Sequence, residues 1–200
     1  MRTFVINNSL NIITKYNSNL SKEDMEKIEY GLTGLYILIT KTVIIFFIAY
    51  LLGILLELII FMIIYNLLRT VSFGIHASKS HICLISSTII FLSAVYLSKY
   101  FILPMWFKFL FGLLGTIYIY KYSPADTEKR PIVDPKRRKI YKILSTLVAT
   151  LMTFISLVVS FNFIANSCIL SILIQCVMVS PITYKLTNQQ YDNYKNYQFD

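Results

Sequence analysis

Six apolar runs occupy most of this 200-residue chain. The hydrocarbon core of a bilayer is about 30 Å thick and takes roughly 20 apolar residues of helix, with about 17 as a lower limit. Only 14% of the residues are charged, against about a quarter in ordinary soluble domains. We therefore expect an all-α, polytopic integral membrane protein with about six transmembrane helices. The expected spans are 32–52, 54–68, 82–98, 102–120, 143–161 and 163–184.

Lysine and arginine are concentrated in one set of connecting segments. Sixteen of them lie in the segments expected on one side of the membrane, which are those before 32, between 68 and 82, within 121–142 and after 184. The connections on the opposite side contain only one, Lys99. Because this excess marks the cytoplasmic side, both termini are expected in the cytoplasm. The predicted organisation is a single membrane domain with an N-terminal segment 1–31, a core 32–184 containing a basic cytoplasmic loop 121–142, and a tail 185–200. Ser21 followed by Asp24 predicts a helix start, with a helix over 21–30 leading into the first span.

The net charge of +9 therefore reflects the basic residues that mark the cytoplasmic side of the membrane. We expect contacts with membrane lipids and none with nucleic acid, because the sequence contains no soluble basic domain.

Reactive side chains are clustered in the link before the third span. Both histidines and Cys83 fall within eight positions there. A thiol needs a base or a lowered pKa to act as a nucleophile near neutral pH, and histidine suits that role. His76 and Cys83 therefore predict a thiol-peptidase dyad, although packing is the commoner use of such residues. His81, two positions from Cys83, would point to nearly the opposite side of a helix and is the weaker base.

The spacing of the dyad constrains the backbone. Seven residues of straight helix would separate His76 from Cys83 by about 10 Å along the axis, whereas a base must come within about 3.2 Å of its nucleophile. The chain must therefore fold back around Gly74 and the polar run 78–80, and such irregular backbone is permitted where it lines a wet cavity.

The sequence has two further cysteines and three possible metal ligands. Cys168 and Cys176 would lie about 12 Å apart in one helix, too far for a disulfide within it, and are interpreted as packing residues. His76, His81 and Cys83 are zinc-type ligands, but a structural zinc normally has four. The sequence also contains no phosphate-binding glycine loop. We expect no metal or other cofactor.

Two motifs together resemble the AgrB family of accessory gene regulator proteins, quorum-sensing membrane endopeptidases that process the pro-peptide AgrD. They are Arg69-x4-Gly74-x-His76-Ala77-x5-Cys83 and Tyr122-Ser-Pro124-Ala-Asp126-x4-Pro131-Ile132, the second followed by a basic run. The resemblance covers nearly the whole chain. Phe73 departs from it, because the family usually has a glycine there, and Arg130 stands where lysine is common.

The resemblance implies a mechanism. Cys83 would be the nucleophile and His76 the general base that together cut the C-terminal part from an AgrD-like pro-peptide, leaving an acyl-thioester. A thiol of the peptide would then close a thiolactone, the autoinducing peptide. Arg69 and Gly74 would support the site, through charge and close backbone approach respectively, although Arg69 is equally compatible with a membrane-interface anchor.

The basic loop offers a second prediction. Besides binding anionic lipid, it is expected to attract an acidic tail on the pro-peptide. The residues assigned to this role are Lys129, Arg130, Lys136, Arg137, Arg138 and Lys139. Asp126 is a further candidate, as a group that orients His76, but its spacing does not argue for it.

Ionisable residues in the apolar runs support an alternative. Glu57, Lys41 and Lys108 are functional candidates at membrane depth, and a small multi-span transporter or channel would depend on them. A salt bridge between Lys41 and Glu57 is the preferred interpretation. A non-catalytic assembly or sensor protein would need neither these residues nor the dyad. Short spans with intramembrane charge favour a homodimer.

Overall fold

The computed structural model describes residues 2–16, 21–75, 80–128 and 131–197. Its helices are α1 (Arg2–Tyr16), α2 (Lys22–Leu51), α3 (Leu55–Ser72), α4 (Ser80–Tyr100), α5 (Met105–Tyr122), α6 (Pro135–Val158), α7 (Asn162–Val179), α8 (Pro181–Leu186) and the short 3-10 helix η1 (Asn193–Asn196). These ranges contain no strand, so the predicted all-α class is confirmed. The chain forms two compact units, Met1–Gly53 and Ile54–Asp200.

The first unit consists of α1 and α2. Ser21 caps α2: its hydroxyl accepts from the Asp24 N–H at 3.1 Å, and the Asp24 carboxylate accepts from the Ser21 N–H at 3.3 Å. This reciprocal pair satisfies two backbone donors at the helix start. The predicted helix start is therefore confirmed, and α2 continues from it through the apolar run for 30 residues.

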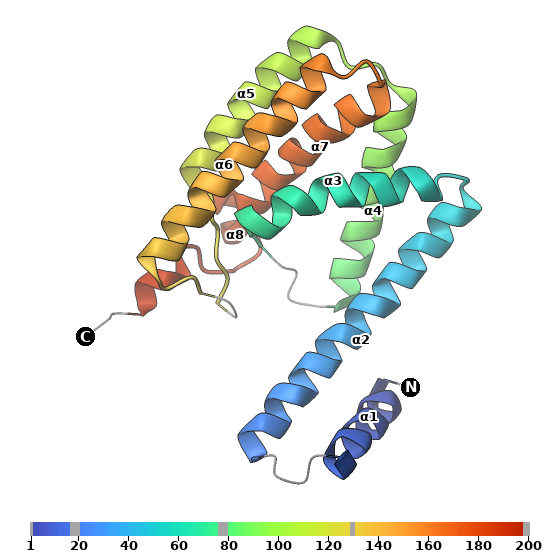
Figure 1. Cartoon of the computed structure of the whole chain (residues 1–200), viewed down its shortest axis with the longest axis vertical. Helices are drawn as coiled ribbons and strands as arrows, with labels where there is room; N and C mark the ends of the chain where they lie inside the picture. Colours follow the sequence, from blue (N-terminus) through green and yellow to red (C-terminus); the bar gives the residue numbers. More distant parts are fainter. Residues whose placement is uncertain (1, 17–20, 76–79, 129–130, 198–200) are drawn as a thin grey trace. The chain divides into compact units, whose positions relative to one another are not determined.

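The second unit packs its helices around α7. Helices α3, α4, α5 and α6 all contact α7, and Figure 1 shows α5, α6 and α7 running alongside one another. A buried cluster joins α3, α5, α6 and α7: Leu68, Ile119, Ala149, Met152, Cys168 and Ile172. Cys168 is thus a packing residue, as predicted, and α7 is the element against which the site is built.

Five of the described helices are long and apolar enough to cross a membrane. They are Asp24–Leu51, Leu55–Ser72, His81–Tyr100, Pro135–Val158 and Asn162–Val179. The predicted run 102–120 corresponds to α5, which has 18 residues but carries Lys108 and Lys121 and is not among the five. The chain is an all-α polytopic membrane protein, while the count of six spans and the orientation stay predictions.

The last apolar run is interrupted where one span was expected. Helix α7 ends at Val179 and α8 begins at Pro181, because proline has no N–H to donate and disfavours helical backbone in the preceding residue. The Ser180 hydroxyl accepts from the Ile182 N–H at 3.3 Å and caps the new helix. The run 163–184 is therefore two helices rather than one.

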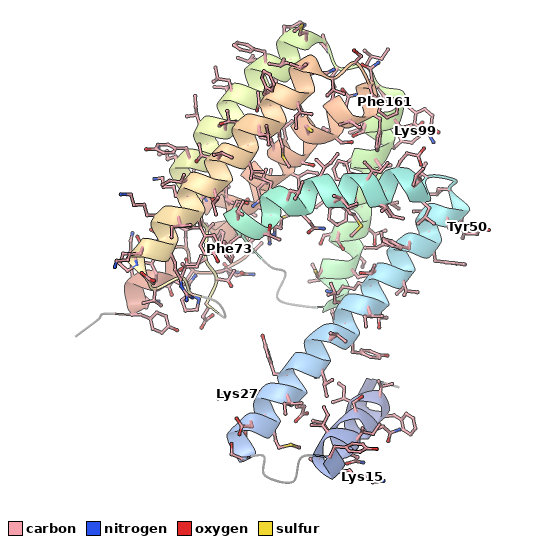
Figure 2. The ribbon with its side chains drawn as sticks, viewed as in Figure 1. Lys15, Lys27, Tyr50, Phe73, Lys99 and Phe161 are labelled. Carbon is pink, nitrogen blue, oxygen red and sulfur yellow. The ribbon has the colours of Figure 1, made fainter. Side chains whose placement is uncertain are left out.

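Glu57 has a different partner from the one predicted. Its carboxylate lies 2.6 Å from the Lys99 ammonium, so the expected pairing with Lys41 is corrected. Glu57 is in the first turn of α3 and Lys99 in the last turn of α4, the helix ends at which the helix dipole favours these charges. Figure 2 shows Lys99 far from Phe73, which marks the other end of α3.

Candidate functional site

Arg69 organises the chain that leads towards the predicted base. It lies in the last turn of α3, and its guanidinium donates to three successive carbonyls, those of Phe73 (2.5 Å), Gly74 (3.1 Å) and Ile75 (2.6 Å). Arginine suits this task because its donors form a rigid planar fork. The bonds favour the supporting role of Arg69 over that of an interface anchor.

Residues 73–75, called the 73–75 segment below, are also held from two other directions. The Gly74 N–H donates to the Ala125 carbonyl at 2.7 Å, and the Ile75 N–H donates to the Met178 carbonyl at 2.9 Å. The Gln175 side chain adds a bond to the Phe73 carbonyl at 2.6 Å. The backbone immediately before His76 is therefore tied to α3, α7 and the loop after α5.

Gly74 is required by this close packing. Its φ is +115°, a conformation that L side chains rarely adopt. A Cβ added there would lie 2.6 Å from the Met178 carbonyl oxygen and would overlap the Arg69 guanidinium. The position thus needs the close backbone approach that only glycine permits.

Phe73 occupies a glycine conformation without being glycine. Its φ of 58° and ψ of −138° lie in a region that costs side-chain-bearing residues about 1–3 kcal/mol. The ring packs edge-on against Tyr141 of α6, with centroids 4.9 Å apart, at the end of α3 labelled in Figure 2. The glycine that the resemblance implies at this position therefore fits the backbone conformation found there.

This backbone conformation reverses the usual order of stability of an alanine and a glycine variant. Phe73→Ala removes the ring contact but keeps the strain, whereas Phe73→Gly removes both. We expect Phe73→Gly to be the more stable variant by about 1 kcal/mol, although glycine is ordinarily the less stable residue by about that amount. Thermal unfolding in detergent measures the difference, and an alanine variant more stable than the glycine variant would contradict the described backbone.

The predicted nucleophile lies at the start of α4. Cys83 is half-buried in the first turn, and its carbonyl accepts from the Ser87 hydroxyl at 2.6 Å. His81 is exposed on the same turn. His76 lies outside the described residues, which leave the chain at Ile75 and resume at Ser80. The pairing of His76 with Cys83 therefore stays a prediction.

Asp126 is a buried acceptor rather than a free carboxylate. Its side chain is 1% exposed and accepts from the N–H groups of Ile132 (3.2 Å), Asn193 (3.1 Å) and Tyr194 (3.0 Å), with the Arg138 guanidinium at 3.5 Å. Three of these donors bond to Oδ2 and one, the Asn193 N–H, bonds to Oδ1, so both carboxylate oxygens are engaged. The geometry favours a role in organising the loop over one as a partner of the histidine.

The basic residues of the loop fall into two groups. Lys136, Arg137 and Lys139 are exposed at the start of α6. Arg138 is turned inward, 3.4 Å from the centre of the Tyr194 ring and paired with Asp126. Lys129 and Arg130 lie outside the described residues. Arg137 pairs with Asp134 at 3.8 Å but stays largely exposed. All three exposed side chains are accessible to a ligand, whereas Arg138 is engaged within the chain.

Two groups that hold the 73–75 segment, the Gln175 side chain and the Met178 carbonyl, were not predicted from the sequence. Gln175 is fully buried, and within the described chain its side-chain oxygen has no hydrogen-bond partner. A glutamine within an apolar run is a recognisable signal, because uncompensated polar groups at membrane depth are costly. A backbone carbonyl carries no such signal.

The bundle and its bonded irregular segment define a helical integral membrane protein with a candidate site at one end of α3 and α7. The sequence profile of the family Accessory gene regulator B matches residues 6–179. The chain belongs to this AgrB family, and the membership supports a role in quorum sensing.

Individual relatives agree with the family match. The AgrB-like protein of Clostridium acetobutylicum is 31% identical over 188 residues, covering 93% of this chain and 89% of that protein. A Listeria monocytogenes AgrB-like protein is 30% identical over 182 residues, with 88% of each chain covered. The accessory gene regulator protein B of Staphylococcus intermedius is 33% identical over 141 residues, covering 70% of this chain and 74% of its own length. No solved structure matches the chain.

Proposed function

We propose that this protein is a cysteine endopeptidase of the bacterial cytoplasmic membrane that cuts an AgrD-like pro-peptide and promotes its cyclisation to a thiolactone. The observation that carries the proposal is the 73–75 segment. Three independent sets of bonds hold this irregular backbone between the end of α3 and the helix of Cys83, directly before a histidine. Such preorganisation is what a catalytic base requires, since small displacements of reacting groups are costly.

The reaction takes place in two acyl transfers. The Cys83 thiolate attacks the scissile carbonyl carbon, the carbon–nitrogen bond breaks, and the departing amine takes a proton from His76. The N-terminal part of the peptide is then held as a thioester on Cys83. A cysteine thiol within the peptide, deprotonated by His76, attacks this thioester, closes the ring and releases Cys83. One thioester replaces another, so the exchange needs no nucleotide.

The acyl-enzyme is the intermediate that distinguishes this mechanism. Purified protein in detergent is mixed with an AgrD-like pro-peptide whose own cysteine is replaced by serine, which slows ring closure. We expect intact-mass spectrometry to show an adduct equal to the N-terminal fragment, located on the Cys83 peptide and removed by hydroxylamine. Cleavage with no hydroxylamine-sensitive adduct, on a pro-peptide shown to be turned over, would rule out the thioester route.

The exposed basic residues are proposed to bind an acidic pro-peptide tail. Reversing Lys136, Arg137 and Lys139 to glutamate should raise KM about 10-fold at low salt while leaving kcat within about 2-fold, because the residues contribute long-range attraction and no chemistry. Lys185→Glu, another exposed basic position, is the matched control. Cleavage rates over a substrate series at two salt concentrations measure the effect, and an unchanged KM would remove these residues from substrate binding.

The transporter alternative receives no support from its acidic residue. Glu57 is engaged by Lys99 at 2.6 Å, which neutralises one of the three ionisable residues on which that alternative depended. We therefore retain the peptidase as the single proposed function.

A further inference from the structure

The C-terminal segment, residues 184–197, is bonded to the loop that holds the 73–75 segment. The Tyr184 hydroxyl donates to the carbonyls of Ala125 at 3.2 Å and Asp126 at 2.9 Å. The same Ala125 carbonyl accepts the Gly74 N–H at 2.7 Å. Burial raises the pKa of Tyr184 above its ordinary value, so its hydroxyl stays protonated and remains a donor. A single carbonyl thus connects the C-terminal segment to the catalytic region.

The Asp126 side chain also connects the loop after α5 to the C-terminal segment. Two of the four donors on its carboxylate are backbone N–H groups of the C-terminal segment, those of Asn193 and Tyr194. Arg138 completes the cluster, pairing with Asp126 at 3.5 Å and stacking on Tyr194 at 3.4 Å. A buried carboxylate that loses such partners is strongly unfavourable. The loop and the C-terminal segment are therefore expected to order together.

The bonds lead to the backbone two residues before the predicted base. Asp126 follows Ala125 in the chain, Ala125 is bonded to Gly74 and also donates to the Ser72 carbonyl at 3.1 Å, and Gly74 is two residues before His76. A loss of order at Asp126 would thus be transmitted to the backbone that sets the histidine. Catalytic groups must be held within roughly half an ångström, which makes this path functionally significant.

We propose that Asp126 is a positioning residue for the catalytic base and that residues 184–197 are the element that holds it in place. This inference rests on the proposed peptidase function. It assigns a role to a part of the chain beyond residue 179, where the family match ends. Asp126 does not contact the peptide in this scheme; it acts through Ala125 and Gly74.

Asp126→Asn is the first test. It removes the charge facing Arg138 and places an amide donor among N–H groups. We expect kcat for pro-peptide cleavage to fall about 10-fold to 100-fold with KM within about 2-fold, because substrate contacts are intact while the base is displaced. The alkylation rate of Cys83 at pH 7, followed on its own peptide by mass spectrometry, should fall in parallel. Glu128→Gln removes the same charge from an exposed position of the same loop and should leave both rates unchanged.

A milder variant keeps the test decisive if Asp126→Asn does not fold. Tyr184→Phe removes one hydroxyl and keeps the ring, and should lower kcat about 5-fold, the effect of one hydrogen bond. Its control is Tyr120→Phe, which removes the hydroxyl of an exposed tyrosine outside the C-terminal segment.

The outcomes separate the two proposals. Wild-type protein that neither cleaves the peptide nor forms an adduct on Cys83 contradicts the proposed function. Wild-type cleavage combined with wild-type kcat and Cys83 alkylation in a folded Asp126→Asn or Tyr184→Phe variant contradicts only the positioning role. A rise in KM at constant kcat would also overturn it, because that result would place Asp126 in substrate binding.

Discussion

Replacing Cys83 by alanine is expected to abolish pro-peptide cleavage, lowering kcat by about 10⁴-fold or more, because the covalent route loses its nucleophile. His76→Ala should cause a comparable loss, since residues that act as a unit cost about as much singly as together. Cys83→Ser should also be close to inactive, because a hydroxyl ionises far less readily than a thiol. Peptide size, followed by mass spectrometry with the variants in membranes, measures the rates.

Two residues of the same kind provide matched controls. Cys176→Ala removes another half-buried thiol, and His81→Ala removes the other histidine, which is exposed on α4. Both variants should cleave within a few-fold of wild type. Cleavage that survives Cys83→Ala, or that is lost equally in His81→Ala, would contradict the assignment of the dyad.

Gly74→Ala is expected to have the second largest effect. The new Cβ would lie 2.6 Å from the Met178 carbonyl oxygen and overlap the Arg69 guanidinium, in a backbone conformation that costs alanine about 1–3 kcal/mol. The 73–75 segment must move to relieve the overlap. Because a displacement of about 1 Å can cost about 100-fold, we expect kcat to fall by at least that factor. Cleavage rates and thermal unfolding in detergent are the measurements.

Gly34→Ala is the control for this variant. Gly34 lies in α2, and a Cβ added there meets nothing within 4 Å. The substitution should be neutral or stabilise the helix by up to about 1 kcal/mol. A Gly74→Ala variant with wild-type activity would show that the 73–75 segment can shift freely, and would remove the structural argument for a preorganised base.

Several elements could be predicted because their signals are local. The apolar runs indicated membrane helices, since hydropathy over about 20 residues reports burial in lipid directly. Ser21 and Asp24 indicated the start of α2 through a capping interaction that spans three residues. The motif around Gly74 indicated a close approach at that residue, which the backbone shows.

Other elements were decided by contacts between distant parts of the chain. From the sequence we expected Lys41 as the partner of Glu57, and no local signal pointed to Lys99, whose pairing depends on how α3 packs against α4. The division of the last run at Pro181 was readable in principle, because proline ends helices, but hydropathy alone continues across it.

The sequence by itself thus determined the class of protein, the helical segments and the residues that offer chemistry, because hydropathy, caps and reactive side chains act over a few residues. Only the tertiary structure decided how the 73–75 segment is held. The bonds from Gln175, Met178 and Ala125 join residues about 50 to 100 positions apart, and two of the three use only backbone N–H and C=O groups, which every residue except proline carries. Such groups leave no mark on the sequence, so their pairing emerges only when the helices pack together.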